Sequence, residues 1–215
     1  MTTPKETLTG VLRALQALRA SEAAFLDVSD DFDGAAAIQE VLSGTPDNDE
    51  GLAVHEEMVH LLERRGGRVS LGVILGLLGH ADERVRIIAS DAVVCAGQED
   101  FDTCFEVAKA AIDRATRSEK ESDRRFLVSI LLILAELGDE QANLTCRQLL
   151  EHPHADVVAA AIEAIGDLED RASIPALRKL RKDARTTNIG SKERPEIKSI
   201  GTLATETIGF LETPH

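Results

Sequence analysis

Apolar positions along the chain recur with the period of an α-helix, and the clearest stretch runs from His154 to Asp183. It reads as two short amphipathic helices joined by a polar turn. Apolar side chains line one face of the first helix at steps of three and four residues, namely Val157, Ala161, Ala164, Ile165 and Leu168. The second helix has its own inward-facing stripe at Ile174, Leu177 and Leu180. A two-helix unit of this size cannot bury its apolar face alone, so it predicts copies of itself nearby.

The same pattern recurs on both sides of this stretch. The apolar anchors of successive units are separated by 31, 41, 31 and 40 residues and are Val54, Val85, Phe126, Val157 and Ile197. A glycine follows the first helix of four units, as a left-handed C-cap requires, and these glycines are Gly66, Gly97, Gly138 and Gly209. The fifth unit has Glu169 at this position. The spacing therefore predicts an array of helix pairs.

Each first helix is followed by a second one, and polar residues suited to capping precede several helices. The second helices are predicted at Val69–Leu78, Asp102–Thr116, Ala142–Leu150 and Ile174–Lys182. The predicted N-caps are Asp82, Asp123 and Ser173. Alternation of the β-strand type is nearly absent, which makes the chain all-α.

These elements predict one domain over residues 1–215, an all-α, right-handed α-solenoid of about five antiparallel helix pairs. Residues 1–46 form an atypical first pair, and residues 47–183 carry the regular repeats. The segment 184–195 is polar, contains glycine and lacks periodicity, so it predicts a mobile loop. Residues 196–212 supply only a first helix, which would cap the end of the array.

Units of 31 to 41 residues with Asp-x-x-Val-Arg-x-x-Ala at Asp82 to Ala89 resemble HEAT repeats, particularly the short bacterial kind also found in phycobilisome-lyase-type proteins. The resemblance covers residues 50 to 212, and it implies that the second helices line a concave face that holds a partner. Only Val85-Arg86 keeps the Val-Arg pair of this family. The ladder of arginines that often ties such repeats together is therefore mostly missing.

Composition fits closely packed helices. The chain has six aromatic residues, all Phe, so its core must consist of Leu, Ile, Val and Ala. Three cysteines, Cys95, Cys104 and Cys146, lie in apolar helical runs without paired spacing and predict buried thiols in a reducing compartment. The longest apolar stretch, Phe126 to Leu137, is too short to span a bilayer, and no targeting signal opens the sequence. We expect a cytoplasmic protein with no membrane partner.

The formal net charge of -14 argues against a non-specific binder of nucleic acid or of a membrane surface, because phosphates would be repelled. The charge is unevenly placed. From Ser21 to His60 there are eleven carboxylates and no Lys or Arg, whereas Arg171 to Lys198 has nine basic residues against three acidic ones. The sequence predicts an acidic N-terminal end and a basic C-terminal patch.

Two strings have the residue types of metal sites. His55 and His60 are spaced i and i+5, about 140° apart on a helix, where a zinc protease needs i and i+4. HEAT-repeat deoxyhypusine hydroxylases use several His-Glu dipeptides, and this chain has one, at His55-Glu56. We therefore predict no metal here and interpret the string, including the Glu57-x-x-His60 step, as a solvated polar helix face.

The other string, from Ser29 to Glu40, places oxygens at positions 1, 3, 5 and 12 of an EF-hand loop and Gly34 at position 6. Ser29 departs from the usual Asp. The alternative is that Asp33 caps a helix beginning at Ala35, and both interpretations stay open. The histidines of His152-Pro153-His154 are predicted to belong to a turn before a helix.

No Gly-rich phosphate loop, Gly-x-Ser-x-Gly elbow or Cys-His pairing is present. We predict a non-catalytic protein–protein interaction module without a cofactor, such as an adaptor, an assembly factor or an inhibitor. Its expected partner-binding residues lie on the second helices and are Glu106, Lys109, Asp113, Arg147, Gln148, Glu151, Arg178, Arg181 and Lys182. The alternatives are a HEAT-fold alkylpurine DNA glycosylase, which would need a basic groove and the Trp or Tyr that are absent here, and a chromophore-lyase-like protein.

Overall fold

The computed structural model describes residues 21, 38, 40–42, 44–46, 48–190 and 194–213. The chain divides into two compact units, Met1–Ile74 and Leu75–His215, and each is described by itself. Helix α4, Gly67–Leu77, contributes residues to both units.

In the first unit, helix α3 spans Asp49–Arg65 and begins at Asn48, whose side-chain oxygen accepts a hydrogen bond from the N–H of Gly51 at 2.9 Å. The predicted register is wrong by one position, because Val54 is 44% exposed whereas His55, Val59 and Leu62 are buried. The reason is a close backbone approach at Gly51. A Cβ added to Gly51 would stand 1.8 Å from the carbonyl oxygen of Pro46, so this side of the helix must face inward.

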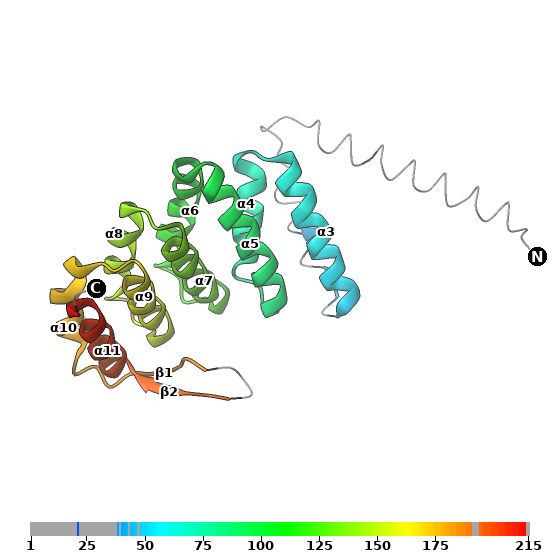
Figure 1. Ribbon diagram of the computed structural model, residues 1–215. Helices are drawn as coiled ribbons and strands as arrows, with labels where there is room; N and C mark the ends of the chain where they lie inside the picture. Colours follow the sequence, from blue (N-terminus) through cyan, green and yellow to red (C-terminus); the bar gives the residue numbers. More distant parts are fainter. Residues whose placement is uncertain are drawn as a thin grey trace, which may run out of the picture. The chain divides into compact units, whose positions relative to one another are not determined.

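The second unit is a two-layer stack of antiparallel helix pairs (Figure 1). The first layer consists of α5 (Glu83–Glu99), α7 (Glu121–Leu137), α9 (Ala155–Asp167) and α11 (Ile200–Glu212). Each of these helices packs on the next. The second layer consists of α6 (Phe101–Ala115), α8 (Glu140–Leu149) and α10 (Ile174–Leu180), which the short 3-10 turn Arg171–Ser173 precedes. Its helices pack mainly on the first layer. This arrangement confirms the predicted solenoid of helix pairs.

The stretch from His154 to Asp183 forms α9 and α10, and α9 lies inside the first layer. In α9, Val157, Ala161, Ala164 and Ile165 are fully buried between α7 and α11, as their spacing predicted. Alanine at two of these positions lets the neighbouring helices lie close to α9. Each fully buried Ile or Leu side chain contributes about 1.5–3 kcal/mol to folding.

The helix ends agree with the predicted stops in three units and differ in two. Gly66 and Gly138 follow their helices with φ of 66° and 71°, and Glu169 occupies the same left-handed region at 49°. The prediction is wrong at Gly97 and Gly209, because α5 continues to Glu99 and α11 to Glu212. Gly97 instead lies against Leu137, whose side chain would be 2.5 Å from an added Cβ.

The predicted helix starts are confirmed in part. Asp82 caps α5 through a 2.9 Å hydrogen bond from the N–H of Arg84. Asp123 is not a cap, because α7 begins at Glu121 and Asp123 lies in its first turn. Ser173 occupies the N-cap position of α10, but its side chain makes no capping hydrogen bond.

A β-hairpin occupies part of the segment 184–195, for which a mobile loop was expected. Strand β1, Thr186–Asn188, pairs antiparallel with β2, Ile197–Ser199. The side-chain oxygen of Asn188 accepts hydrogen bonds from the N–H groups of Gly190 and Glu196, at 3.1 and 2.8 Å. The predicted anchor Ile197 therefore lies in a strand, where it is 63% exposed. Helix α11 starts three residues later and buries Gly201, Ala204 and Ile208, as the pattern predicted.

Candidate functional site

The residues expected to bind a partner lie on the second layer. Eight of them are exposed on α6, on α8 with the turn that follows it, and on α10 with its C-terminal end: Glu106, Lys109, Asp113, Gln148, Glu151, Arg178, Arg181 and Lys182. The ninth, Arg147, is half-buried. Two of the three arginines among these nine residues are engaged within the fold. Arg178 forms an ion pair with Glu212 at 2.8 Å, and Arg147 belongs to an internal cluster.

That cluster joins α8 to the turn before α10. The guanidinium of Arg147 donates two parallel hydrogen bonds to the carboxylate of Asp170, at 2.7 and 2.6 Å, and a third to Ser173 at 3.0 Å. Asp170 is 7% exposed and Ser173 is completely buried. Burial alone would raise the pKa of Asp170, but the hydrogen bonds from Arg147 and Ser173 outweigh it and lower the pKa. The guanidinium of Arg147 therefore stabilises the fold and is not presented to a partner.

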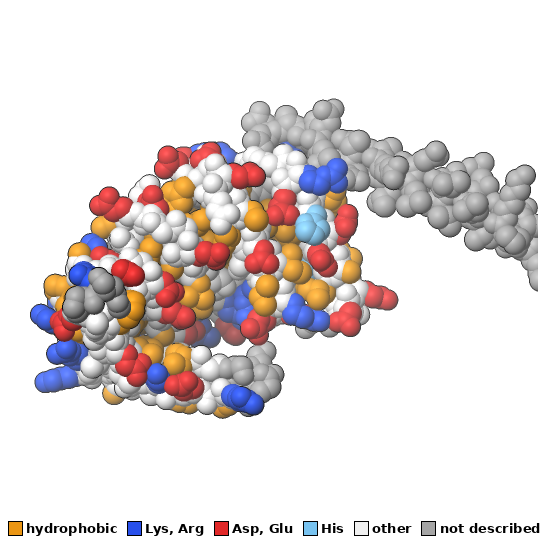
Figure 2. Space-filling view, viewed as in Figure 1, with side chains coloured by type: hydrophobic (Ala, Val, Ile, Leu, Met, Phe, Trp, Pro, Cys, Tyr) orange, Lys and Arg blue, Asp and Glu red, His pale blue; other side chains and the backbone are white. Residues whose placement is uncertain are grey.

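Two open cavities of about 420 and 500 Å³ lie on the first layer and share Val128, Leu132 and Asp156. We call their combined lining the first-layer groove. It consists of Glu83, Arg86, Ile87, Ser90, Arg125, Val128, Ser129, Leu132, Ile133, Glu136, Asp156, Ala159, Ala160, Ile162, Glu163, Thr187, Asn188, Ile189, Leu203, Glu206 and Thr207. Helices α5, α7, α9 and α11, strand β1 and the residue that follows it supply these residues. In Figure 2 the surface is hollowed between the hairpin and the helices above it.

Large apolar side chains are exposed inside this groove. Ile87 is 54% exposed, Leu132 39% and Ile189 43%. Exposed apolar side chains that gather in one concavity mark a binding surface more often than scattered ones do. The sequence contained a signal for one of these positions. Ile87 lies two residues after the anchor Val85, so it faces away from the core, as the groove residue Val128 does two residues after Phe126.

The groove is acidic. Its lining has five carboxylates and two guanidinium groups, and the guanidinium groups are already bound. Arg86 donates to the carbonyl oxygens of His80 and Ala81, at 2.9 and 3.1 Å. Arg125 donates to Glu121 at 2.6 Å and to the carbonyl oxygen of Gly79 at 3.1 Å. Figure 2 shows acidic and hydrophobic side chains side by side on the face in view, while basic ones gather at the end that carries α10.

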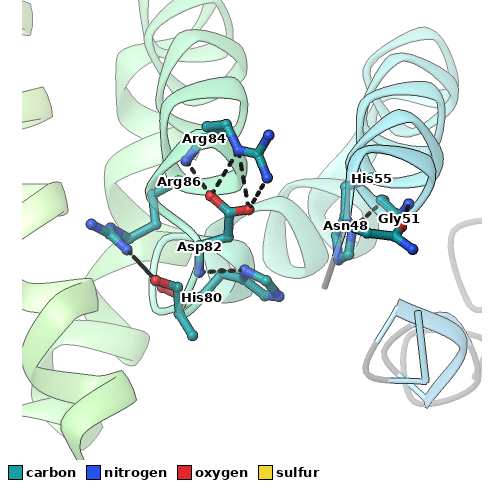
Figure 3. Close-up of polar contacts among 8 residues, drawn as sticks. Asn48, Gly51, His55, His80, Asp82, Arg84 and Arg86 are labelled. Atoms are coloured by element: carbon teal, nitrogen blue, oxygen red, sulfur yellow. Dashed lines mark hydrogen bonds and ion pairs between the residues drawn. The ribbon is translucent and has the colours of Figure 1, made fainter. Parts of the chain in front are cut away.

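The turns before α5 and α9 have the same construction. In the first, the ring Nδ1 of His80 accepts the N–H of Asp82 at 3.1 Å (Figure 3). In the second, Nδ1 of His152 accepts the N–H of His154 at 3.3 Å. An arginine closes both turns, but its origin differs. Arg86 comes from the helix that follows its turn, as Figure 3 shows.

The arginine of the second turn comes from beyond α10. The guanidinium of Arg185 donates to the carbonyl oxygens of His152 and Pro153, at 2.9 and 2.8 Å, and is held by the carboxylate of Asp183. Arg185 therefore replaces the arginine that is missing from α9, where Val158 corresponds to Arg86. The prediction that His152-Pro153-His154 forms a turn before a helix is confirmed.

We expect the second turn to make stability depend on pH. Burial, with a smaller contribution from His154, lowers the pKa of His152 below its ordinary 6.5. The unfolded chain thus takes up a proton near pH 6.5, while the folded chain resists it until a lower pH. The contribution of the neutral His152 to the free energy of unfolding is therefore fully present above pH 6.5 and is lost as the pH falls below 6.5. His152→Asn, whose side-chain oxygen can accept the same N–H, should flatten this slope in urea unfolding between pH 7.5 and 5. His60→Asn, at an exposed histidine, should keep the wild-type slope, and an unchanged slope in His152→Asn would contradict the assignment.

Among the residues that the structure describes, no group of His, Cys, Asp or Glu side chains is arranged to hold a metal ion. The expected solvated face is wrong for His55, which is buried and whose Nδ1 lies 2.8 Å from the carbonyl oxygen of Gly51 (Figure 3). His60 is exposed and contacts Glu63 at 3.1 Å. The calcium hypothesis for Ser29 to Glu40 lies, apart from positions 38 and 40, outside the described residues.

The cysteines follow the prediction in two of three positions. Cys104 and Cys146 are buried, and burial raises the pKa of their thiols to about 11 and about 12. Cys95 is exposed, so the prediction is wrong there. It lies on α5 one residue after the buried Val94, on the opposite side from the core.

Part of the chain resembles a known repeat family, and two solved structures of repeat proteins are similar to it. Residues 108–189 match the family model of HEAT repeats, which supports the resemblance to such repeats that the sequence predicted. One similar solved structure is a computationally designed armadillo repeat protein for modular peptide recognition, with a TM-score of 0.40, 16% identity, and coverage of 91% of this chain and 93% of that one. A second designed armadillo repeat protein has a TM-score of 0.37 and 15% identity, with coverage of 89% and 99%. No curated protein matches the chain.

Within the described part of the chain, none of the helices combines the length and the apolar character needed to cross a membrane.

Proposed function

We propose that this protein is a non-catalytic protein-binding module and that it holds a segment of a protein partner in the first-layer groove. The observation that carries the proposal is the exposure of Ile87, Leu132 and Ile189 in this groove. Burial of such side chains against a partner gains about 25 cal/mol for each Å² of apolar surface removed from water. The repeat architecture supports the proposal, since stacked repeats present extended surfaces of this kind.

The second layer offers a weaker surface for the same function. Of its five expected basic residues, Arg147 and Arg178 are bound within the fold, which leaves Lys109, Arg181 and Lys182 for an acidic partner. Leu144 is its large exposed apolar side chain, at 55%. The groove also argues against the glycosylase alternative, because its carboxylates would repel the phosphates of DNA.

Selection of a random 12-residue peptide library on the full chain tests the proposal. We expect Leu132→Asp to weaken the selected peptides at least about ten-fold, because it places a charge where an apolar side chain of the peptide would pack. Leu144→Asp is the matched control, since it makes the same change at an exposed leucine of the second layer. Affinities are measured by fluorescence anisotropy.

Two results would contradict the proposal. If the selected peptides bind the wild type and Leu132→Asp equally, the groove is not the binding site. Peptides that lose affinity in Leu144→Asp, or in a variant with Arg181 and Lys182 both replaced by Glu, would move the site to the second layer.

A further inference from the structure

One cavity of the groove has a single carboxylate that no Lys or Arg of the described residues pairs with. The cavity of about 420 Å³ is lined by Asp156, Glu163 and Glu206 and by no Lys or Arg. Asp156 is paired with Arg124 at 3.0 Å, and Glu206 with Lys198 at 3.0 Å. Within the described residues, no Lys or Arg pairs with Glu163. Glu163, on α9, is therefore the carboxylate of this cavity that has no paired cation among the described residues.

The surroundings of Glu163 favour the arrival of a cation. Glu163 is exposed at the cavity, but partial loss of water raises the pKa of its carboxyl, and the neighbouring Asp167 raises it further. A positive charge placed beside Glu163 would favour the ionised carboxylate and so offset these effects. Leu132, Ile162 and Ile189 line the same cavity, so an apolar side chain can be buried within reach of the carboxylate.

We infer that the partner segment held by the groove carries a Lys or Arg directly beside a branched apolar residue, with the cation at Glu163 and the apolar side chain between Leu132 and Ile189. The inference rests on the proposed function and adds the chemistry of the partner. Charge complementarity carries it. Among the described residues, two of the five carboxylates of the groove, Asp156 and Glu206, are paired with a cation, whereas both of its guanidinium groups are bound within the fold. An acidic or purely apolar segment would leave Glu163 uncompensated beside it.

Three fluorescein-labelled 12-residue peptides test this chemistry on the full chain. They share leucines at the same positions and carry Lys, Ser or Glu at all others. We expect the Lys peptide to bind at least about ten-fold more tightly than the Ser peptide, and the Glu peptide more weakly than either. Raising the NaCl concentration from 50 to 300 mM should reduce this preference, because salt screens partly exposed charges.

Glu163→Gln separates the local effect from the net charge of the chain. We expect it to weaken the Lys peptide about three- to ten-fold and to leave the Ser peptide unchanged. The matched control is Glu151→Gln, which removes an exposed carboxylate from the turn after α8 and should have no effect. Equal losses in both variants would mean attraction to the overall negative charge and would overturn the inference.

The outcomes also separate this inference from the proposed function. If the Lys and Ser peptides bind equally and both lose affinity in Leu132→Asp, the groove is a binding site but the inference about the cation fails. If no peptide responds to Leu132→Asp, the proposed function fails and the inference fails with it.

Discussion

Replacing Arg147 with Met lowers the free energy of unfolding by about 3 kcal/mol, because the substitution leaves the carboxylate of Asp170 buried without its counter-ion. Asp170 is 7% exposed and receives two hydrogen bonds from Arg147. The methionine keeps much of the volume of the arginine stem, so the decrease in the free energy of unfolding reflects the loss of the charge and of the hydrogen bonds. Urea unfolding at pH 7, followed by circular dichroism, measures it.

The chain contains a matched control for this prediction. Arg178 and Glu212 form a single ion pair whose side chains are 56% and 47% exposed. Arg178→Met should change stability by less than about 1 kcal/mol, since exposed ion pairs contribute little. Arg147→Lys should lie between, because lysine keeps the charge but cannot form the two parallel hydrogen bonds. A loss in Arg147→Met no larger than that in Arg178→Met would show that the cluster does not stabilise the fold.

Gly201→Ala destabilises the fold by about 2 kcal/mol, because helix α11 passes too close to the end of the preceding helix to admit a methyl group. A Cβ at Gly201 would stand 2.5 Å from the carbonyl oxygen of Arg181 and 3.1 Å from that of Asp183. Both contacts are with backbone, and the N–H of Gly201 donates to the same Asp183 oxygen at 2.9 Å. No side chain can move away to relieve the clash.

A substitution of Gly209, in the same helix, should have the opposite effect on stability. Nothing lies within 4 Å of a Cβ added there, and the position is inside α11. Gly209→Ala should therefore stabilise the fold by up to about 1 kcal/mol, the usual preference for alanine over glycine in a helix. Thermal or urea unfolding of both variants compares them. Destabilisation by Gly209→Ala would mean that Gly209 ends the helix, as its place in the sequence pattern first indicated.

The helix pairs of the array could be predicted from the sequence because their apolar positions recur at three- and four-residue steps. The anchors Val85, Phe126 and Val157 are all buried. The pattern failed where backbone contacts decide the register. Val54 is exposed because a close backbone approach at Gly51 turns a different side of α3 inward, and periodicity alone does not contain that contact.

The candidate site was harder to predict than the fold. Charged residues on the second helices were expected to bind a partner, but Arg147 and Arg178 find partners inside the chain, 23 and 34 residues away. Such pairings depend on tertiary structure and not on local pattern. The groove was missed for a related reason. Its third exposed apolar side chain, Ile189, follows β1, a strand three residues long that periodicity does not reveal.

Methyl-selective NMR of the full chain tests the central claim most directly, since it reports which surface a bound peptide touches. Isoleucine and leucine methyl groups are assigned by substitution and followed as the Lys peptide is added. We predict that the largest shift changes occur at Ile87, Leu132 and Ile189, while Leu144 on α8 stays unchanged. Changes confined to Leu144 and its neighbours on the second layer, with the groove methyl groups unmoved, would contradict the assignment of the binding site.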